Sequence, residues 1–335
     1  MRKFKKSHLV LAIMLLIGIP VVAVGLFTRL NPYDCTEAER FDVLTGSCYY
    51  NCTSSQDCAD KAKAVDDQLN SFFEGAQTKV TKQSDTHAAP LPPSTNDGTK
   101  LLTKAFTGSE TDGTIYAVTK KLTLVPTPTS SDKELWDLFS RVVGQADLLR
   151  YIQSFEVFND PDNDSAASVW QSQTLGKWHV NVNGSFKDDK KDIVHTMVHE
   201  YGHIVSLNST QIKGDSDGAC PYLRLGEGCA NQGSYINAFY DKYWSKYGAN
   251  APANEGQDTN EVSAFYNQRQ LAFVSEYAAT NYGEDWAESW ATFVTTGKPS
   301  GTLEKDKKVL FFYGYAPLQS TRDRIRVQIA SCRCI

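Results

Sequence analysis

The chain has 335 residues, enough for one large or two smaller domains with a substantial core. Its formal net charge is −5, from 34 Lys and Arg against 39 Asp and Glu, and no basic stripe lies outside the extreme N-terminus. Nucleic-acid binding requires such a stripe, so we expect no nucleic-acid partner. No internal repeat is visible either, which excludes a repeat array.

Residues 1–30 carry a membrane signal. Four basic residues among the first six precede an uncharged apolar run from Leu9 to Phe27, close to the ~20 residues that span a bilayer as a helix. A secretory signal peptide is the alternative, because Ala23-Val24-Gly25 offers a small-residue cleavage site. The basic flank should stay in the cytoplasm. The rest of the chain is therefore predicted to lie outside the cytoplasm, as a single-pass membrane protein or in secreted form.

Residues 31–60 are predicted to form a Cys-rich segment held by disulfide bonds. All eight cysteines follow the apolar run, and an even number in an exported segment is typical of disulfides. A zinc site is the alternative, but the spacing contains no C-x-x-C pair. Two cysteines near the middle of the chain should close a short loop, while the last two could bond to each other or to this segment. In order, the eight are Cys35, Cys48, Cys52, Cys58, Cys220, Cys229, Cys332 and Cys334.

Residues 61–130 are predicted to contain a helix, a linker and a strand. The helix covers about residues 60–82, and residues 84–100 have the Pro-, Ser- and Thr-rich composition of a linker. His87 in this linker is expected to be solvated. Residues 114–125 are rich in β-branched residues and predict a strand that ends at Pro126.

Residues 131–335 are predicted to form one α+β domain with a small antiparallel sheet and a helical C-terminal half. In the strand predicted at 177–183, apolar residues alternate with His179 and other polar residues, and His179 should be exposed. Its free edge could pair with an extended peptide. The three strands, which predict an antiparallel meander, cover residues 151–158, 166–171 and 177–183. The helices are predicted at 131–143, 188–207, 232–246, 264–279 and 284–295, followed by one or two terminal helices.

The helix predicted at residues 188–207 carries the pattern H-E-x-x-H at His199, Glu200 and His203. On a helix this spacing places two imidazoles one turn apart on one face, with a carboxylate beside them. Two imidazoles and a third protein ligand can bind zinc and leave a fourth position for water, whose proton Glu200 can accept. At 100° per residue the motif lies largely outside the apolar arc of the helix, which argues against ordinary core histidines.

Two more residues of this helix need an interpretation. His195 starts about 12 Å from His203 at 1.5 Å rise per residue, so both cannot bind one ion, and we expect His195 to lie beside the site or to support it. Gly202 costs roughly 1 kcal/mol against Ala in a helix interior. A close approach by another segment is one reason for a glycine at this position.

The third ligand is expected from residues 275–290. Glu284 and Glu288 lie one helical turn apart, so the first carboxylate can bind the metal while the second orients a ligating imidazole. The alternative is a solvated acidic face. Trp286 and Trp290 indicate instead that this helix is buried, and buried carboxylates need partners.

His-Glu-Tyr-Gly-His at residues 199–203 and the segment from Tyr277 to Glu288 together resemble the gluzincin metallopeptidases, such as the anthrax lethal factor catalytic domain and related bacterial zinc metallopeptidases. The resemblance covers roughly residues 130–297, although 81 residues separate His203 from Glu284, more than it predicts. It implies a zincin-like fold and the following roles. Zn²⁺ would be bound by His199, His203 and Glu284, with Glu200 as general base, Tyr277 as oxyanion donor and Glu288 as the partner of a ligand.

The sequence therefore predicts an extracytoplasmic zinc endopeptidase that acts on a protein or peptide substrate and contacts the membrane through its N-terminal helix. A non-catalytic cell-surface binding protein with a structural zinc site is one alternative, and a zinc amidase acting on cell-wall peptides is another. Glu200 argues against the first alternative, because a structural zinc site needs no general base.

Overall fold

The computed structural model describes residues 39–42, 47–50, 53–76, 78, 113–172, 174–214, 220–252 and 258–331. The predicted membrane or signal segment, the linker with His87, and the pairing of the first four and last two cysteines lie outside the described residues and side chains. Within the described part of the chain, no helix combines the length and the apolar character needed to cross a membrane.

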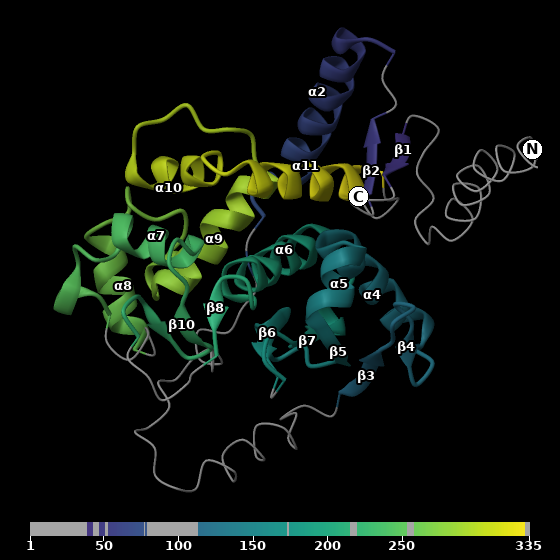
Figure 1. The fold of residues 1–335 in the computed structure, drawn as a ribbon, viewed down its shortest axis with the longest axis horizontal. Helices are drawn as coiled ribbons and strands as arrows, with labels where there is room; N and C mark the ends of the chain where they lie inside the picture. Colours follow the sequence, from purple (N-terminus) through teal and green to yellow (C-terminus); the bar gives the residue numbers. More distant parts are fainter. Residues whose placement is uncertain are drawn as a thin grey trace, which may run out of the picture.

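The fold is mixed α+β, as expected, with a small sheet and many helices (Figure 1). Its N-terminal part is the hairpin of β1 (Glu39–Asp42) and β2 (Ser47–Tyr50), followed by α2 (Ser55–Phe72). Ser54 caps α2 by accepting a hydrogen bond from the Asp57 amide. The helix begins and ends earlier than the predicted residues 60–82 and packs against the last helix of the chain.

The main sheet has five strands in the order β4-β3-β5-β7-β6. The strand predicted at 114–125 is a hairpin of two shorter strands, and the next three strands lie where they were predicted. They are β3 (Thr114–Val118), β4 (Leu124–Val125), β5 (Ile152–Phe158), β6 (Ala167–Gln171) and β7 (Trp178–Asn183). Three pairs are antiparallel, whereas β5 and β7 are parallel.

The predicted antiparallel meander is therefore wrong, and Asn183 supplies a physical reason. Its side-chain amide donates to the carbonyls of Asp160 and Ser165, and its side-chain oxygen accepts from the Asp160 amide. These bonds fasten the β5–β6 connection across the end of β7, so that β6 adds on the far side of β7. The strand β7 is consequently internal, and the expectation that it offers a free edge is also wrong; among described strands that edge belongs to β6.

Helices cover the sheet and continue into a separate helical half (Figure 1). Figure 1 shows α6 at the centre of the molecule, between the sheet and the later helices, and it packs against α4, α7, α9 and β6. The helices near the sheet are α4 (Ser130–Val143), α5 (Gln145–Tyr151) and α6 (Lys190–Leu207). The helical half contains α7 (Tyr235–Tyr243), α8 (Thr259–Asn267), α9 (Tyr282–Thr295), α10 (Glu304–Phe312) and α11 (Ala316–Ala330).

A second small sheet joins the two halves. Its strands are β8 (Ile212–Lys213), β9 (Arg224–Leu225) and β10 (Gly228–Ala230), in the order β8-β10-β9. The disulfide bond predicted between Cys220 and Cys229 is present and closes the loop that contains β9. The described chain also contains the short 3-10 helices η1 (Gly184–Phe186), η2 (Gly248–Asn250) and η4 (Tyr277–Ala279).

The prediction of one continuous helix at residues 264–279 is wrong. The helix α8 ends at Asn267, and only the short 3-10 helix η4 follows before α9. Phe265 and Phe273 would lie about 12 Å apart along a continuous helix, at 1.5 Å per residue. Their ring centroids are 5.6 Å apart, and both rings pack on Trp244. Burial of this aromatic cluster breaks the helix, an effect of tertiary packing that local periodicity does not report.

Gly202 lies where α6 meets α9, and the close approach predicted for it is confirmed. A Cβ atom at Gly202 would lie 2.7 Å from Cδ1 of Trp290 and 3.3 Å from Cα of Ala287. The indole of Trp286 also donates to the Gly202 carbonyl at 3.0 Å. The backbone of α6 therefore touches α9 directly.

Replacing Gly202 with Ala should destabilise the protein even though Ala is the better helix former. The propensity gain is about 1 kcal/mol. Overpacking against the fully buried Trp290 should cost roughly 1–3 kcal/mol or more. We expect Gly202→Ala to lower the free energy of unfolding, measured by urea denaturation. Gly297→Ala is the matched control, because its new Cβ would meet nothing closer than 3.4 Å. Equal stability of the two variants would contradict this packing argument.

Candidate metal centre

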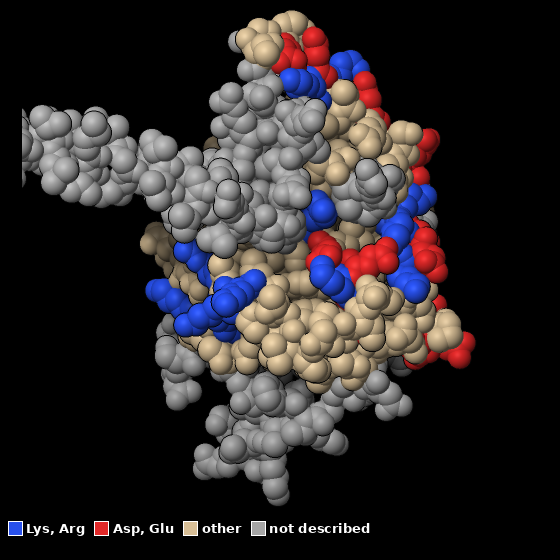
Figure 2. Space-filling view, turned by 90° about the vertical axis from the view of Figure 1, so that its right-hand side faces the viewer, with Lys and Arg blue, Asp and Glu red and all other residues tan. Residues whose placement is uncertain are grey.

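Buried acidic residues are concentrated on the two helices that meet at Gly202. On the face seen in Figure 2, Lys and Arg gather at the lower left, whereas acidic and basic side chains alternate toward the right-hand edge. Six acidic residues of the described part are nevertheless buried, and five of them belong to α6 or α9. A buried charge is costly unless it is paired or binds a metal, so this interface needs a chemical explanation. The six are Glu156, Asp192, Glu200, Glu284, Asp285 and Glu288.

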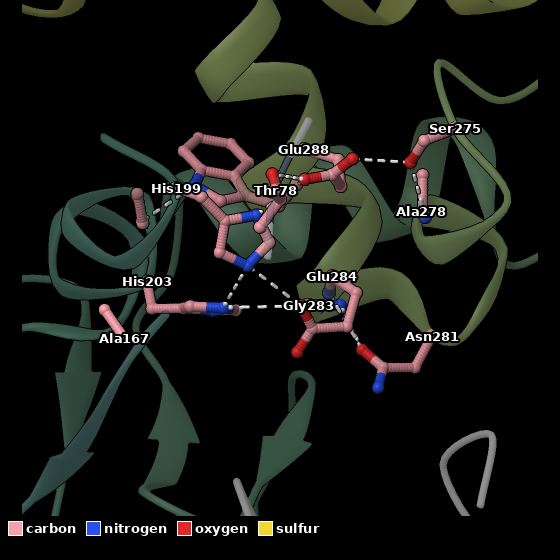
Figure 3. A network of polar contacts seen from close by, with 12 residues as sticks. Thr78, Ala167, His199, His203, Ser275, Ala278, Asn281, Gly283, Glu284 and Glu288 are labelled. Atoms are coloured by element: carbon pink, nitrogen blue, oxygen red, sulfur yellow. Dashed lines mark hydrogen bonds and ion pairs between the residues drawn. The ribbon is translucent and has the colours of Figure 1, made fainter. Parts of the chain in front are cut away.

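Three potential ligand atoms converge between α6 and α9, as Figure 3 shows. Nε2 of His199 lies 3.1 Å from Nε2 of His203 and 3.1 Å from Oε2 of Glu284. Nε2 of His203 lies 3.5 Å from the same carboxylate oxygen. All three side chains are buried. This group could hold a metal ion, and it consists of the three residues predicted as ligands.

Local structure fixes the position of each ligand. The two histidines lie one turn apart on α6, which Asp189 caps by accepting from the Asp192 amide. On α9 the cap is Asn281, whose side-chain oxygen accepts from the amides of Gly283 and Glu284. Glu284 therefore lies in the first turn of α9. A carboxylate in this position also interacts favourably with the helix dipole.

Glu288 lies one turn further along α9 and contacts the opposite nitrogen of His199. Nδ1 of His199 donates to Oε1 of Glu288 at 2.8 Å, which leaves Nε2 directed at the ligand cluster. Ser275 donates to the other oxygen of Glu288 at 2.5 Å. Burial alone would raise the pKa of Glu288, but the hydrogen bond and charge of His199 and the charge of His195 outweigh it and lower this pKa to about 2. Glu288 is therefore an ionised support for the imidazole, in the place predicted.

The same carboxylates control the protonation of His199. Burial disfavours its charged form, but hydrogen bonds to Glu284 and Glu288 raise the pKa of His199 well above its usual value. Burial alone would raise the pKa of Glu284. The charge of His203 and the hydrogen bond from His199 outweigh burial and hold this pKa well below its usual value. The two ionised groups stabilise each other. A metal ion that binds Nε2 of His199 must therefore compete with a proton.

The two residues predicted to act on substrate lie beside this cluster. Glu200 is buried on α6, directly after the ligand His199. Tyr277 lies in η4, half-buried, with its ring centroid 5.8 Å from that of His199. The structure thus brings together five of the six residues singled out from the sequence, His199, His203, Tyr277, Glu284 and Glu288, and Glu200 follows His199 on α6.

The other two histidines of interest are not part of the ligand group. Nδ1 of His195 lies 3.1 Å from the Thr78 hydroxyl, and the ring packs edge-on against Phe73. His179 was expected to be exposed but is half-buried, because its ring contacts Ser154 and packs against Trp170. The prediction that His195 lies beside the site agrees with this arrangement.

Sequence reasoning missed three residues at this centre. Thr78 and Ser275 both donate to the Glu288 carboxylate, and no spacing pattern connects them with α9. Glu227 lies in the β9–β10 turn, inside the disulfide loop. Burial raises the pKa of Glu227, while its own backbone N–H and the charge of His203 lower it in part, which places this carboxylate within electrostatic reach of the cluster. The disulfide loop was the signal that could have drawn attention to Glu227.

Comparisons with known proteins do not identify the chain. It matches no protein-family model, and neither the curated proteins nor the solved structures gave a match. The geometry of the site is therefore the main indication of function.

Removing Glu284 should weaken metal binding more than altering Glu288 does. Glu284→Ala removes one of three donor atoms, whereas Glu288→Gln keeps all three and disturbs only the support of His199. For Glu288→Gln we expect a loss of about 10- to 100-fold in Zn²⁺ affinity, and for Glu284→Ala a larger loss. Competition with a chromophoric chelator measures both, with the exposed Glu261→Ala as control. Full affinity in Glu284→Ala would overturn the ligand assignment.

Metal binding should release a proton at neutral pH. Because hydrogen bonds to Glu284 and Glu288 raise the pKa of His199, its imidazole in the metal-free chain keeps a proton to higher pH than a free imidazole does. The metal displaces this proton, so affinity should fall as the pH decreases, by about tenfold per pH unit below that pKa. Calorimetric titration with Zn²⁺ in buffers of different ionisation enthalpy counts the protons released. An affinity that does not change between pH 6 and pH 8 would contradict this linkage.

Proposed function

We propose that the protein is a zinc-dependent peptidase. The observation that carries this proposal is the triangle of donor atoms formed by His199, His203 and Glu284, with edges of 3.1, 3.1 and 3.5 Å. Zinc bonds of about 2.0–2.1 Å at tetrahedral angles place neighbouring donor atoms about 3.3 Å apart. One face of a zinc tetrahedron therefore fits these atoms with little rearrangement.

The composition of the site also favours a catalytic zinc over a structural one. Structural zinc sites are closed by four protein ligands, whereas catalytic sites use three and keep one position open. The described residues offer three converging donors, and the buried Glu200 directly follows one of them, His199, on α6. This donor set of two imidazoles and one carboxylate, together with the spacing of H-E-x-x-H, supports the resemblance to the gluzincin metallopeptidases.

The roles of the protein groups follow from their positions. Zinc held by the three ligands would polarise a scissile carbonyl and lower the pKa of a water molecule at its open position to about 7. Glu200 would accept the proton of the attacking water and pass it to the leaving amine. The Tyr277 hydroxyl would donate a hydrogen bond to the oxyanion that develops. Glu288 would keep His199 in the tautomer whose Nε2 faces the cluster.

An extended peptide has a place to bind at the edge of the main sheet. Among described strands, β6 pairs only with β7, so its other edge is free for β-addition. The helix α6 packs against β6, and Ala167 at the start of β6 lies beside His203 in Figure 3. We propose that substrate lies along β6, which would present its carbonyl groups to the cluster.

The proposed place of action is outside the cytoplasm. The disulfide bond between Cys220 and Cys229 is typical of an oxidising compartment and supports this assignment. The apolar run from Leu9 to Phe27 would act as the membrane anchor or as the export signal.

Replacing the general base should abolish hydrolysis without releasing the metal. We expect Glu200→Gln to bind stoichiometric zinc and to lose about 10²- to 10⁴-fold in kcat, the usual contribution of general base catalysis. Tyr277→Phe should also keep its zinc and lose about 10²- to 10³-fold. The measurement is mass spectrometry of a mixed peptide library incubated with the purified full-length chain, with Tyr266→Phe, which replaces a tyrosine of α8, as control.

The same assay separates the proposal from its alternatives. Zinc in the unmutated protein without turnover of any peptide would contradict the peptidase proposal and favour a binding protein. Cleavage of cell-wall peptides alone, with the mixed library intact, would change the substrate class to that of an amidase. Full activity in Glu200→Gln would remove this residue from the mechanism.

A further inference from the structure

Thr78 contacts the metal centre from a segment that the sequence placed outside the main domain. It follows α2, and its hydroxyl donates to Oε1 of Glu288 and lies 3.1 Å from Nδ1 of His195. Figure 3 shows Thr78 beside Glu288, on the opposite side of His199 from the other ligands. The residue is therefore close to the support of a ligand rather than to the open side of the cluster.

The hydroxyl proton of Thr78 determines the direction of the hydrogen bonds among His195, Thr78 and Glu288. A threonine hydroxyl has one hydrogen to donate, and an ionised carboxylate only accepts. Because Thr78 donates to Glu288, Nδ1 of His195 must donate to the Thr78 oxygen. The same oxygen of Glu288 also accepts from Nδ1 of His199. A directed chain thus runs from His195 through Thr78 to the carboxylate that orients a ligand.

The segment that carries Thr78 is anchored independently of this contact. Leu69 and Phe73 belong to the arm, defined as residues 55–76 together with Thr78, and both are buried in the common core. The guanidinium of Arg326 on α11 donates to the side chain of Asp66 at 2.8 Å, and Lys191 on α6 donates to the Glu74 carbonyl at 3.1 Å. The arm is thus attached to both α6 and α11, so Thr78 is presented to the site by a docked element.

We propose that Thr78 is a positioning residue of the metal centre, whose hydroxyl fixes the Glu288 carboxylate in the orientation that supports His199. Metal affinity then depends on the docked arm. The dependence is reciprocal, since a metal that binds better when the arm is docked also favours docking. This inference rests on the proposed zinc site and adds to it a contribution from the arm.

The direct test compares two substitutions that differ in the hydroxyl. Thr78→Val keeps the shape of the side chain and removes the donor, whereas Thr78→Ser keeps the donor and removes the methyl group. In the full-length chain we expect Zn²⁺ affinity to fall about 10- to 100-fold in Thr78→Val and to be restored in Thr78→Ser. Thr321→Val is the control, because that hydroxyl donates to the Pro317 carbonyl within α11.

A second measurement separates positioning from a purely structural role. Hydrogen exchange of residues 69–76 is measured with and without Zn²⁺. In the unmutated chain zinc should slow exchange in the arm, and in Thr78→Val this effect should shrink. If Thr78 had only a structural role, the Thr78→Val substitution would speed hydrogen exchange in the arm by the same factor with and without Zn²⁺. This readout remains informative where the Val substitution loosens the fold.

Three results would overturn the inference about Thr78, and a fourth would overturn the proposed function instead. Zinc affinity in Thr78→Val equal to that of the unmutated chain would overturn the inference, as would a Thr78→Ser variant as weak as Thr78→Val. Exchange in the arm that zinc does not alter would overturn it as well. An unmutated chain that binds no zinc would instead overturn the proposed function, so the two failures are distinguishable.

Discussion

The direct contact between α6 and α9 at Gly202 is the constraint on which the candidate site depends. Helix periodicity alone places His199 and His203 together, but a third ligand from another helix requires the two backbones to be close. A glycine on α6 allows Trp290 to lie where a Cβ atom would be, and Trp286 seals the contact with its hydrogen bond to the Gly202 carbonyl. The geometry of the cluster is thus a result of core packing.

The rotation of α9 about its axis is equally important, and a buried ion pair controls it. Asp285, next to the candidate ligand Glu284, lies 2.5 Å from Nζ of Lys308 on α10 and accepts from the indole of Trp244 at 2.7 Å. Burial tends to raise the pKa of Asp285, with Lys308 opposing it, so the pair carries a desolvation cost. Successive helix residues point about 100° apart. An Asp285 held toward α10 therefore leaves Glu284 and Glu288 facing α6.

Local sequence patterns predicted the parts of the fold that are determined locally. The apolar periodicity of α6, the strands with alternating residues and the pair at Glu284 and Glu288 all follow from neighbours within one or two turns. The order of strands in the main sheet depends on Asn183, which fastens the β5–β6 connection across the end of β7. The end of α8 depended on Phe273 packing against distant rings. No spacing rule reports such long-range contacts, and for this reason Thr78 was not recognised from the sequence.

The H-E-x-x-H motif therefore specifies less of this site than its strength as a pattern suggests. The Nε2 atom of His199 faces the cluster because its other nitrogen, Nδ1, donates to an acceptor, Glu288 on α9. Glu288 in turn accepts from Ser275, just before η4, and from Thr78, beyond α2. Four separate segments of the chain thus meet at the Glu288 carboxylate. A site assembled in this way draws on the arm, η4 and both helices, so the proposed metal affinity would depend on the tertiary structure around it.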